Sequence, residues 1–284
     1  MGLSFDIGGS RIRAARGGQA LGEVTTPAEV GAFVAAIAGF LTPQDRALAI
    51  SIAGVVDPGT QAIKVANIPC IDGRRLAPDL AAALGRRVLV LNDADCFVLA
   101  EVAQGAARGH RNVFGIILGS GVGGGLVIDG RLVQGAGGFA GEWGHGPVIR
   151  APALACGCGQ TGCLDTVGSA RGLERLHEHL TGEIIGSVEV IRRWRGGRPM
   201  PAVNLWLDLV AGQLAMVVNV VGASVVPVGG GLSNDRALIA ALDRAVRARI
   251  LRRLDQPLVV VAEAGPDAGL IGAAYAGEVE FGAA

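Results

Sequence analysis

The chain has 284 residues, of which 50% are hydrophobic, and its 25 basic side chains are balanced by 25 acidic ones. This length fits one large domain or two smaller ones with a sizeable core. A formal net charge of zero argues against non-specific nucleic-acid binding, which depends on clustered Lys and Arg. The odd number of cysteines, 5, and the lack of a basic n-region favour the cytoplasm over secretion. We also find no charge-free apolar run of the ~20 residues that span a membrane.

Short apolar runs alternate with helical spacings along the chain, which predicts an α/β fold. The predicted strands cover residues 3–7, 11–15, 47–52, 88–91, 113–118, 126–128, 224–228 and 258–261. The predicted helices cover 30–41, 94–107, 204–221, a segment that begins at Asn234, and 268–275. A strand, a glycine turn and a returning strand occur twice, at 3–15 and 113–128. We therefore expect two related halves with a boundary near Leu118, and a surface excursion at 181–201.

Glycine clusters follow three of the predicted strands, at residues 6–10, 119–125 and 229–231. Glycine lets backbone N–H groups approach an oxygen-rich anion, although each cluster alone is also compatible with an ordinary tight turn. Three of them together favour phosphate binding. The chain has neither a P-loop motif nor the full dinucleotide fingerprint. A carboxylate at Asp6, beside such a turn, suggests an intervening Mg²⁺, and the alternative is that Asp6 caps the turn.

Three polar side chains, Asn92, Asp93 and Asp95, lie where a predicted strand ends and a helix begins. Either aspartate is a reasonable helix cap. The other would be left at the end of a strand, where a carboxylate can act as general base toward a hydroxyl group.

One imidazole and three thiols occur within a short glycine-rich stretch, namely His145, Cys156, Cys158 and Cys163. This set is typical of a closed, tetrahedral, structural zinc site. Zinc on His145 would also orient the loop that carries Glu142. The remaining cysteines and histidines have no ligand-like neighbours. We interpret Cys70 and Cys96 as core or pocket-lining residues, and His110, His177 and His179 as surface residues.

In this order and across the whole chain, these motifs resemble the ROK sugar kinases (repressors, open reading frames, kinases). Residues 6–10 resemble the family's phosphate-1 motif, and Asn92-Asp93 resembles its N-D pair. Residues 119–126 resemble its phosphate-2 loop, and 229–231 its adenosine-side turn. Residues 142–145 match its E-x-G-H signature, and 156–163 with Asp165 match its zinc motif. This pair of signatures is the most specific part of the resemblance.

The resemblance implies the actin-like ATPase fold, also described as hexokinase-like or ribonuclease-H-like, in which two α/β domains flank a central cleft. We expect an N-terminal domain at 1–118, joined by the last helix at about 268–284, and a C-terminal domain at 119–267. The implied cofactors are ATP, Mg²⁺ and structural Zn²⁺.

The resemblance also assigns roles to individual residues, with Asp93 as the catalytic base. The implied sugar contacts, besides Asp93, are Gly54, Asn67, Asn92, Glu142, His145 and Asp165. The implied nucleotide contacts are Asp6, Gly8, Gly9, Ser10, Arg11, Gly119, Ser120, Gly121, Gly123, Gly124, Gly229, Gly230 and Gly231. The sequence departs from the usual family pattern at four positions, with Ser10 for Thr, Arg11 for Lys, Asp95 for Asn, and Asp165 for a Glu that is one methylene longer.

The implied activity is ATP-dependent phosphorylation of the 6-hydroxyl of an aminosugar or hexose. Residues 66–69, 156–160 and 231–234 look most like bacterial N-acetylglucosamine kinases, so N-acetyl-D-glucosamine is the favoured substrate. Glucokinase and N-acetylmannosamine or fructose kinase are the alternatives within the family. A transcriptional repressor of the family would need a DNA-binding module ahead of Asp6. A sugar sensor without catalysis would be expected only if Asp93 were missing, and a filament-forming actin relative would need neither Glu142 and His145 nor the zinc cysteines. We expect a cytoplasmic homodimer that binds neither nucleic acid nor membrane.

Overall fold

The computed structural model describes residues 2–282, and the chain divides into two compact units. Unit 1 contains the residues up to Arg108, Leu132–Ala140 and those from Ala264 on. Unit 2 contains Gly109–Arg131 and Gly141–Glu263. The first change of unit comes at Gly109 rather than near Leu118, because the strand Val113–Leu118 pairs with strands of unit 2.

Unit 1 is built on a five-stranded sheet in the order β3-β2-β1-β4-β7. Its strands are β1 (Leu3–Ile7), β2 (Arg11–Arg16), β3 (Gln19–Thr25), β4 (Ala47–Ile52) and β7 (Arg87–Asn92). Strand β1 is antiparallel to β2 and parallel to β4, which is parallel to β7. A small second sheet pairs β5 (Val55–Val56) with β6 (Ile63–Lys64).

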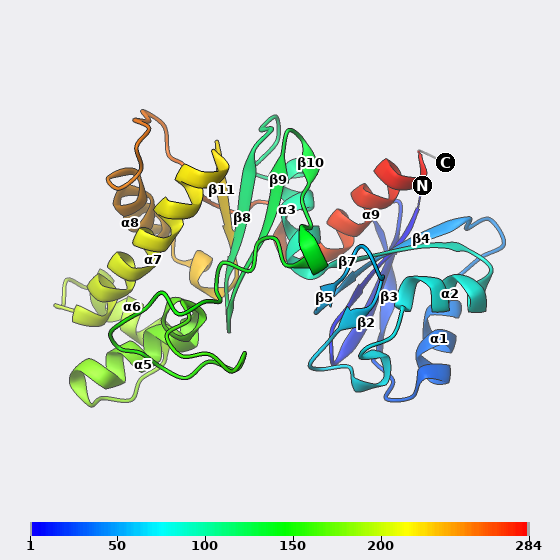
Figure 1. The fold of residues 1–284 in the computed structure, drawn as a ribbon, viewed down its shortest axis with the longest axis horizontal. Coiled ribbons are helices and arrows are strands. Elements are labelled where there is room, and N and C mark those ends of the chain that lie inside the picture. Colours follow the sequence, from blue (N-terminus) through cyan, green and yellow to red (C-terminus); the bar gives the residue numbers. More distant parts are fainter. Residues whose placement is uncertain (1, 283–284) are drawn as a thin grey trace. The chain divides into compact units, whose positions relative to one another are not determined.

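Helices cover both faces of this sheet, because side chains of a strand alternate between its two faces. Leu3, Phe5 and Ile7 of β1 share a core with α1 (Val30–Ala38) and α2 (Leu76–Leu84). The opposite face, which carries Ser4 and Asp6, contacts α9 (Ala268–Phe281), and α9 packs on α3 (Asp93–Gln104). Figure 1 shows α1 and α2 together in blue and cyan, and α9 in red.

Unit 2 repeats the arrangement with a sheet in the order β10-β9-β8-β11-β12. Its strands are β8 (Val113–Leu118), β9 (Val122–Ile128), β10 (Arg131–Leu132, at the change of unit), β11 (Val226–Gly229) and β12 (Val259–Val261). Its helices are α4 (Asp165–Gly168), α5 (Ala170–Thr181), α6 (Ser187–Arg195), α7 (Pro201–Val221) and α8 (Arg236–Arg247). The core of this unit lies between the sheet and these helices, with Trp206 fully buried in it.

Helix α7 is long and apolar enough to cross a membrane by length and composition alone. One side of the helix, however, lies in the core of unit 2, where the Trp206 indole N–H donates to the Gly168 carbonyl at 2.9 Å. A core helix passes the same compositional test, so the test alone is weak evidence for a membrane span.

Two expectations about the surface were wrong. The stretch 181–201 contains α6, whose Val190 and Ile191 enter the core of unit 2. His177 is a buried residue of α5 rather than a surface residue, and its Nε2 lies 3.2 Å from a Glu183 carboxylate oxygen. Helix α5 has apolar side chains on one face only, so a histidine at the edge of that face is drawn into the core with its neighbours.

Candidate functional site

In unit 1, the carboxyl ends of three parallel strands lie side by side. Ile7 of β1 is in register with Ile52 of β4, which is in register with Asn92 of β7. Asp6, Gly54 and Asn92 therefore meet at one edge of the sheet, although they are far apart in the sequence. Ligands of open α/β sheets bind at this edge.

Asp6 lies near the end of β1 and is half-buried. Its Oδ2 accepts a hydrogen bond from Arg13, and its Oδ1 accepts one from the Ser51 hydroxyl at 3.0 Å. Arg13 also donates to Asp267 at 2.7 Å. Burial lowers the pKa of Arg13, but the two carboxylates outweigh it and raise that pKa. From the sequence, Asp6 was expected either to lie beside a bound cation or to cap the glycine turn, and the structure adds this guanidinium.

The hairpin between β1 and β2 carries Gly8, Gly9, Ser10 and Arg11. Its backbone closes through the Gly8 N–H, which donates to the Arg11 carbonyl at 2.9 Å. A Cβ added at Gly9 would lie 2.8 Å from the Asn67 side chain, so only glycine allows these two segments to meet. Ser10 is exposed, and the Arg11 guanidinium is paired with Glu23 at 2.6 Å.

Asn92 is the N-cap of α3. Its Oδ1 accepts from the N–H of Ala94 at 2.7 Å and of Asp95 at 3.3 Å, and its Nδ2 donates to the Gly54 carbonyl at 2.8 Å. The N-cap is therefore Asn92 rather than Asp93 or Asp95, although the Ala94 N–H also lies 3.0 Å from the Asp93 Oδ1. Asp93 is exposed on the first turn, and Asp95 is buried.

In unit 2, the hairpin between β8 and β9 carries residues 119–124 and is held by Asp165 of α4. The Asp165 Oδ1 accepts from the Val122 N–H at 2.7 Å, and the Asp165 N–H donates to the Gly144 carbonyl at 2.8 Å. A Cβ at Gly121 would lie 2.8 Å from the same Oδ1. The aspartate therefore joins the glycine hairpin to the segment 142–145, while Ser120 stays exposed.

Trp143 fixes the other side of that segment. Its indole N–H donates to the Gly123 carbonyl at 2.9 Å, and its ring meets the edge of Phe114 with centroids 5.8 Å apart. The flanking residues Glu142 and His145 are about one-third exposed, with a carboxylate oxygen 3.7 Å from Nε2. Both side chains are therefore accessible to a solute. The backbone that carries them is held at two points, by Asp165 and by Trp143.

His145, Cys156, Cys158 and Cys163 form one cluster, with all four ligand atoms within 4.8 Å of one another. The His145 Nδ1 lies 3.7 Å from the Cys156 sulfur, and the sulfurs of Cys158 and Cys163 are 3.6 Å apart. A zinc tetrahedron with Zn–S near 2.3 Å and Zn–N near 2.0–2.1 Å has edges of about 3.6–3.8 Å. The donor set and its spacing therefore fit zinc. A hydrogen bond from the Gln160 backbone lowers the pKa of Cys158 to about 7, whereas burial raises the pKa of its neighbour Cys156 to about 11. A metal, which binds thiolates, would therefore displace a proton from Cys156.

The third glycine cluster lies at the end of β11. Gly229 is the last residue of that strand, Gly230 turns the chain with a φ of 86°, and Gly231 begins a short 3-10 helix. Thus each predicted cluster follows a strand of a five-stranded sheet, one in unit 1 and two in unit 2.

Three residues that contact the predicted site residues were not identified from the sequence, namely Arg13, Ser51 and Trp143. Arg13 is the cross-strand partner of Asp6 in the hairpin, and Ser51 is its partner on β4. The register of the hairpin is enough to predict that Arg13 lies opposite Asp6. Predicting Ser51 would also require the order of the strands in the sheet.

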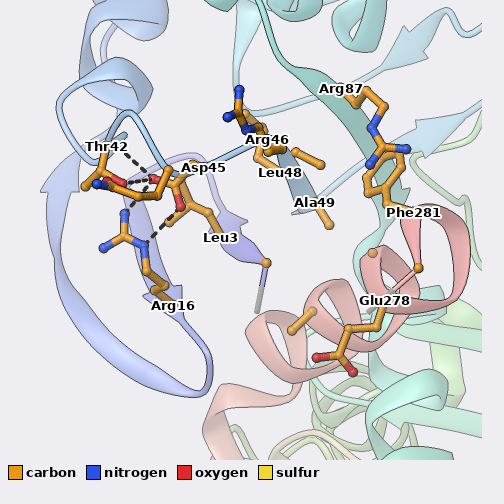
Figure 2. A pocket seen from close by; sticks show the side chains of 16 residues that line it. Leu3, Arg16, Thr42, Asp45, Arg46, Leu48, Ala49, Arg87, Glu278 and Phe281 are labelled. Atoms are coloured by element: carbon orange, nitrogen blue, oxygen red, sulfur yellow. Dashed lines mark hydrogen bonds and ion pairs between the residues drawn. The ribbon is translucent and has the colours of Figure 1, made fainter. Parts of the chain in front are cut away.

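A cavity of about 490 Å³ opens in unit 1, at the opposite ends of the same strands (Figure 2). Leu3, Leu48 and Phe281 line it together with an ion pair in which the Arg16 guanidinium donates twice to Asp45. Burial raises the pKa of Asp45, but hydrogen bonds from Arg16 and Thr42 outweigh it and hold that pKa below its usual range. None of the predicted site residues lines this cavity.

The ROK family model matches residues 3–278. The chain is 34% identical to the N-acetylgalactosamine kinase AgaK of Shewanella sp. (strain ANA-3), over 98% of this chain and 96% of that protein. It is 38% identical to the N-acetyl-D-glucosamine kinase of Pectobacterium carotovorum subsp. carotovorum (strain PC1), over 79% and 78%.

Two solved structures are similar over nearly the whole chain. The ROK hexokinase from Thermus thermophilus has a TM-score of 0.86 at 30% identity and covers 99% of this chain and 98% of its own. The ROK family glucokinase from Streptomyces griseus, in complex with glucose and AMPPNP, has a TM-score of 0.74 at 29% identity, with 96% and 97% covered. The expected actin-like α/β fold is confirmed, and the chain belongs to the ROK family.

Proposed function

We propose that this protein is an ATP-dependent kinase for the 6-hydroxyl of N-acetyl-D-glucosamine. The observation that carries the proposal is the cap of α3. Because Asn92 satisfies the N–H groups at the helix start, the helix does not need Asp93 as its N-cap. Asp93 is then an exposed carboxylate at the edge of the sheet where Asp6 and Gly54 also lie.

Asp93 would accept the proton of the sugar hydroxyl as that hydroxyl attacks the γ-phosphate. Phosphoryl transfer depends mostly on positioning and on stabilisation of charge. Backbone N–H groups of Gly9, Ser10 and Arg11 would hold the phosphates from unit 1, next to Gly8, whose own N–H closes the hairpin on the Arg11 carbonyl. Unit 2 would hold phosphates with Gly119, Ser120, Gly121, Gly123 and Gly124, and the adenosine side with Gly229, Gly230 and Gly231. Each oxygen of Asp6 accepts one hydrogen bond, which leaves lone pairs for the waters of Mg²⁺.

The sugar contacts proposed besides Asp93 are Gly54, Asn67, Asn92, Glu142, His145 and Asp165. In two of them part of the hydrogen-bonding capacity is already used. Asn92 has one N–H left after its bond to Gly54, and Asp165 has Oδ2 left after its bond to Val122. Asp165 would therefore reach a sugar hydroxyl through that one oxygen.

We propose structural zinc at His145, Cys156, Cys158 and Cys163, a complete four-ligand set with the spacing of a tetrahedral site. Zinc at Nδ1 would leave Nε2 of His145 facing Glu142. These two side chains would then meet the sugar with a fixed orientation. Elemental analysis should find about one zinc per chain.

The preferred sugar is tested by comparing kcat/KM among N-acetylglucosamine, N-acetylgalactosamine, glucose, N-acetylmannosamine, mannose and fructose. We expect N-acetylglucosamine to be best, with cross-activity, because such pocket differences are often worth only ~1–3 kcal/mol. The relatives that are an N-acetylgalactosamine kinase and a glucokinase make these two sugars the main competitors. A higher kcat/KM for either sugar would change the proposed substrate but not the proposed kinase activity. No ATP consumption with any sugar would reject the kinase activity and favour a sugar sensor.

We also propose that the two units act as the two domains of the kinase around a central cleft. The enzyme is expected to work in the cytoplasm as a homodimer, without nucleic-acid or membrane partners.

A further inference from the structure

The cavity of unit 1 in Figure 2 is separate from the proposed active site. It opens where the parallel strands β4 and β7 begin, whereas the predicted site residues of unit 1 lie where these strands end. Its volume of about 490 Å³ lies within the roughly 300–1,000 Å³ that is typical of small-molecule sites. The cavity is therefore large enough for a ligand that the proposed reaction does not use.

The floor of the cavity is apolar. Leu48 and Ala49 reach it from β4, and Gly277 and Phe281 reach it from α9. A Cβ added at Gly277 would lie 3.1 Å from the Ala49 Cβ, so α9 packs closely on β4 here. Leu48 and Ala49 are buried, and Phe281 is half-buried. Such a floor favours a ligand with an apolar body, because contact removes apolar surface from water.

Two arginines lie at the rim of the cavity, where adjacent strands begin. Arg46 precedes β4 and Arg87 is the first residue of β7, and the Arg87 N–H donates to the Arg46 carbonyl at 3.3 Å. Both side chains are exposed, and within residues 2–282 neither forms an ion pair. Two neighbouring cations without a carboxylate repel each other. An anion bound to both would remove this repulsion.

Arg87 is held in an orientation that suits an anion. Its guanidinium carbon lies 4.7 Å from the centroid of the Phe281 ring, and Figure 2 shows the two groups together. The ring covers one face of the guanidinium and leaves the N–H groups at its edge, which can bind both oxygens of a carboxylate. A third arginine at the cavity, Arg16, already donates twice to Asp45. Arg46 and Arg87 are therefore the groups that a ligand can use.

The charged residues that line the cavity carry one excess positive charge. Arg16 and Asp45 cancel in their ion pair, and Glu278 of α9 offsets one of the two remaining arginines. Figure 2 shows Glu278 on the side of the cavity away from Arg46 and Arg87. A ligand with a single negative charge would complete the balance, whereas inorganic phosphate would leave the apolar floor unused.

We propose that this cavity binds a small organic anion, whose carboxylate is held by Arg46 and Arg87 and whose planar apolar body rests on Leu48 and Phe281. A planar body suits Phe281, because aromatic rings pack favourably against one another. The site shares no residue with the proposed sugar and nucleotide contacts. Binding is measured without turnover, so the proposal can fail or hold independently of the kinase activity.

The probe is 2-naphthoate, and its matched control is 2-naphthylmethanol, which has the same rings and no charge. Isothermal titration calorimetry should show one naphthoate per chain, with a dissociation constant for naphthylmethanol that is at least ~10-fold higher. Inorganic phosphate should also bind at least ~10-fold more weakly than naphthoate. Saturating ATP and N-acetylglucosamine should leave the naphthoate affinity unchanged, and displacement by ATP would assign the probe to the nucleotide site and overturn the proposal.

The arginines are tested one at a time. Arg46→Gln and Arg87→Gln should each raise the dissociation constant of naphthoate at least ~10-fold and leave that of naphthylmethanol nearly unchanged, because only naphthoate forms charge-assisted hydrogen bonds. Both side chains are exposed, so both variants should melt near the temperature of the parent. Arg108→Gln is the matched control, because Arg108 is also exposed in unit 1 and lies outside the cavity. It should bind naphthoate as the parent does.

The apolar part of the site is tested by Ala274→Phe, which fills the cavity from α9 and should block both probes. Its melting temperature shows whether the variant is folded, and the two arginine variants carry the test if it is not. Equal affinity of the parent for naphthoate and naphthylmethanol would overturn the proposal. Naphthoate binding that survives both arginine changes, or no naphthoate binding by the parent, would overturn it as well.

Discussion

The two sheets have the same plan, but their first hairpins use charge in different ways. In each sheet the first strand of the unit is antiparallel to the next strand and parallel to a third, which is parallel to a fourth. In unit 1 the hairpin strand itself carries the carboxylate, Asp6, together with the cross-strand Arg13. In unit 2 the hairpin carries no charge, and its carboxylate, Asp165, comes from α4.

This difference suggests a division of work. The sheet edge of unit 1, which carries Asp6 and Asp93, is suited to binding a cation and to accepting a proton. A neutral glycine hairpin, supported by Asp165 and Trp143 from outside, is suited to holding anionic phosphates and orienting a loop. If this is correct, changes in unit 1 should mainly lower turnover, and changes in unit 2 should mainly weaken binding.

The largest effect is expected from Asp93→Asn, which removes the proton acceptor and preserves the shape. We expect kcat to fall by ~10²–10⁴-fold, the usual worth of a general base, while sugar binding changes little. Because Asn92 caps α3, the melting temperature should stay near that of the parent. A folded variant that turns over within a few-fold of the parent would contradict the assignment.

The second test is the metal cluster of unit 2. Cys158→Ser should lower zinc affinity by more than the ~10–100-fold that is typical of changes around a metal site. The sugar KM should rise more than kcat falls, because Glu142 and His145 lose their orientation. Cys70→Ser changes a cysteine of unit 1 and serves as the control. Full activity of a zinc-free protein would show that the metal cluster is not needed for the sugar site.

A smaller effect is expected when the unit 2 hairpin loses its support. Asp165→Ala leaves the Val122 N–H without its acceptor, which should lower the free energy of unfolding by roughly 1–3 kcal/mol. Asp165→Asn keeps an oxygen for this bond and should recover most of the stability. If both variants unfolded at the same denaturant concentration, the bond from Val122 would not support the hairpin.

The smallest effect concerns pH and lies in unit 1. Because the pKa of Asp45 is held below its usual range, its contribution to stability is present above the ordinary aspartate pKa and is lost as the pH falls through the lowered value. Asp45→Asn should therefore flatten the loss of stability between neutral and acidic pH. Urea unfolding at neutral and at acidic pH measures the free energy of unfolding at both ends of this range. If the change in that free energy with pH were the same in the variant and the parent, the ion pair with Arg16 would add nothing to stability.

The sequence predicted most of the architecture because its strongest signals are local. Buried strands such as β1, β4 and β8 are short, mostly apolar runs with a glycine within two residues of their end, and each was placed correctly. Strand β3 was missed because all of its residues are exposed, so no apolar alternation marks it. The metal cluster was found because its four ligands lie close together in the sequence, and their side chains also cluster in space.

The details that failed depend on competition among neighbours. Asn92, Asp93 and Asp95 are all good caps by residue type, and only the backbone geometry selects Asn92. The partners of Asp6 depend on strand order and register, which the sequence pattern does not specify. Glu101 is fully buried and accepts from the N–H of Ala106 and of Ala264, and no local pattern indicates a carboxylate in that place.

Trp143 also gives the protein a built-in optical probe. The chain has 3 tryptophans, and Trp206 lies in the core, while Trp194 is half-buried on α6. With Trp194 and Trp206 replaced by phenylalanine, the remaining emission would come from an indole bonded to Gly123 and next to Glu142. Its intensity and wavelength would then follow zinc loading and sugar binding in real time, without a label or a coupled assay.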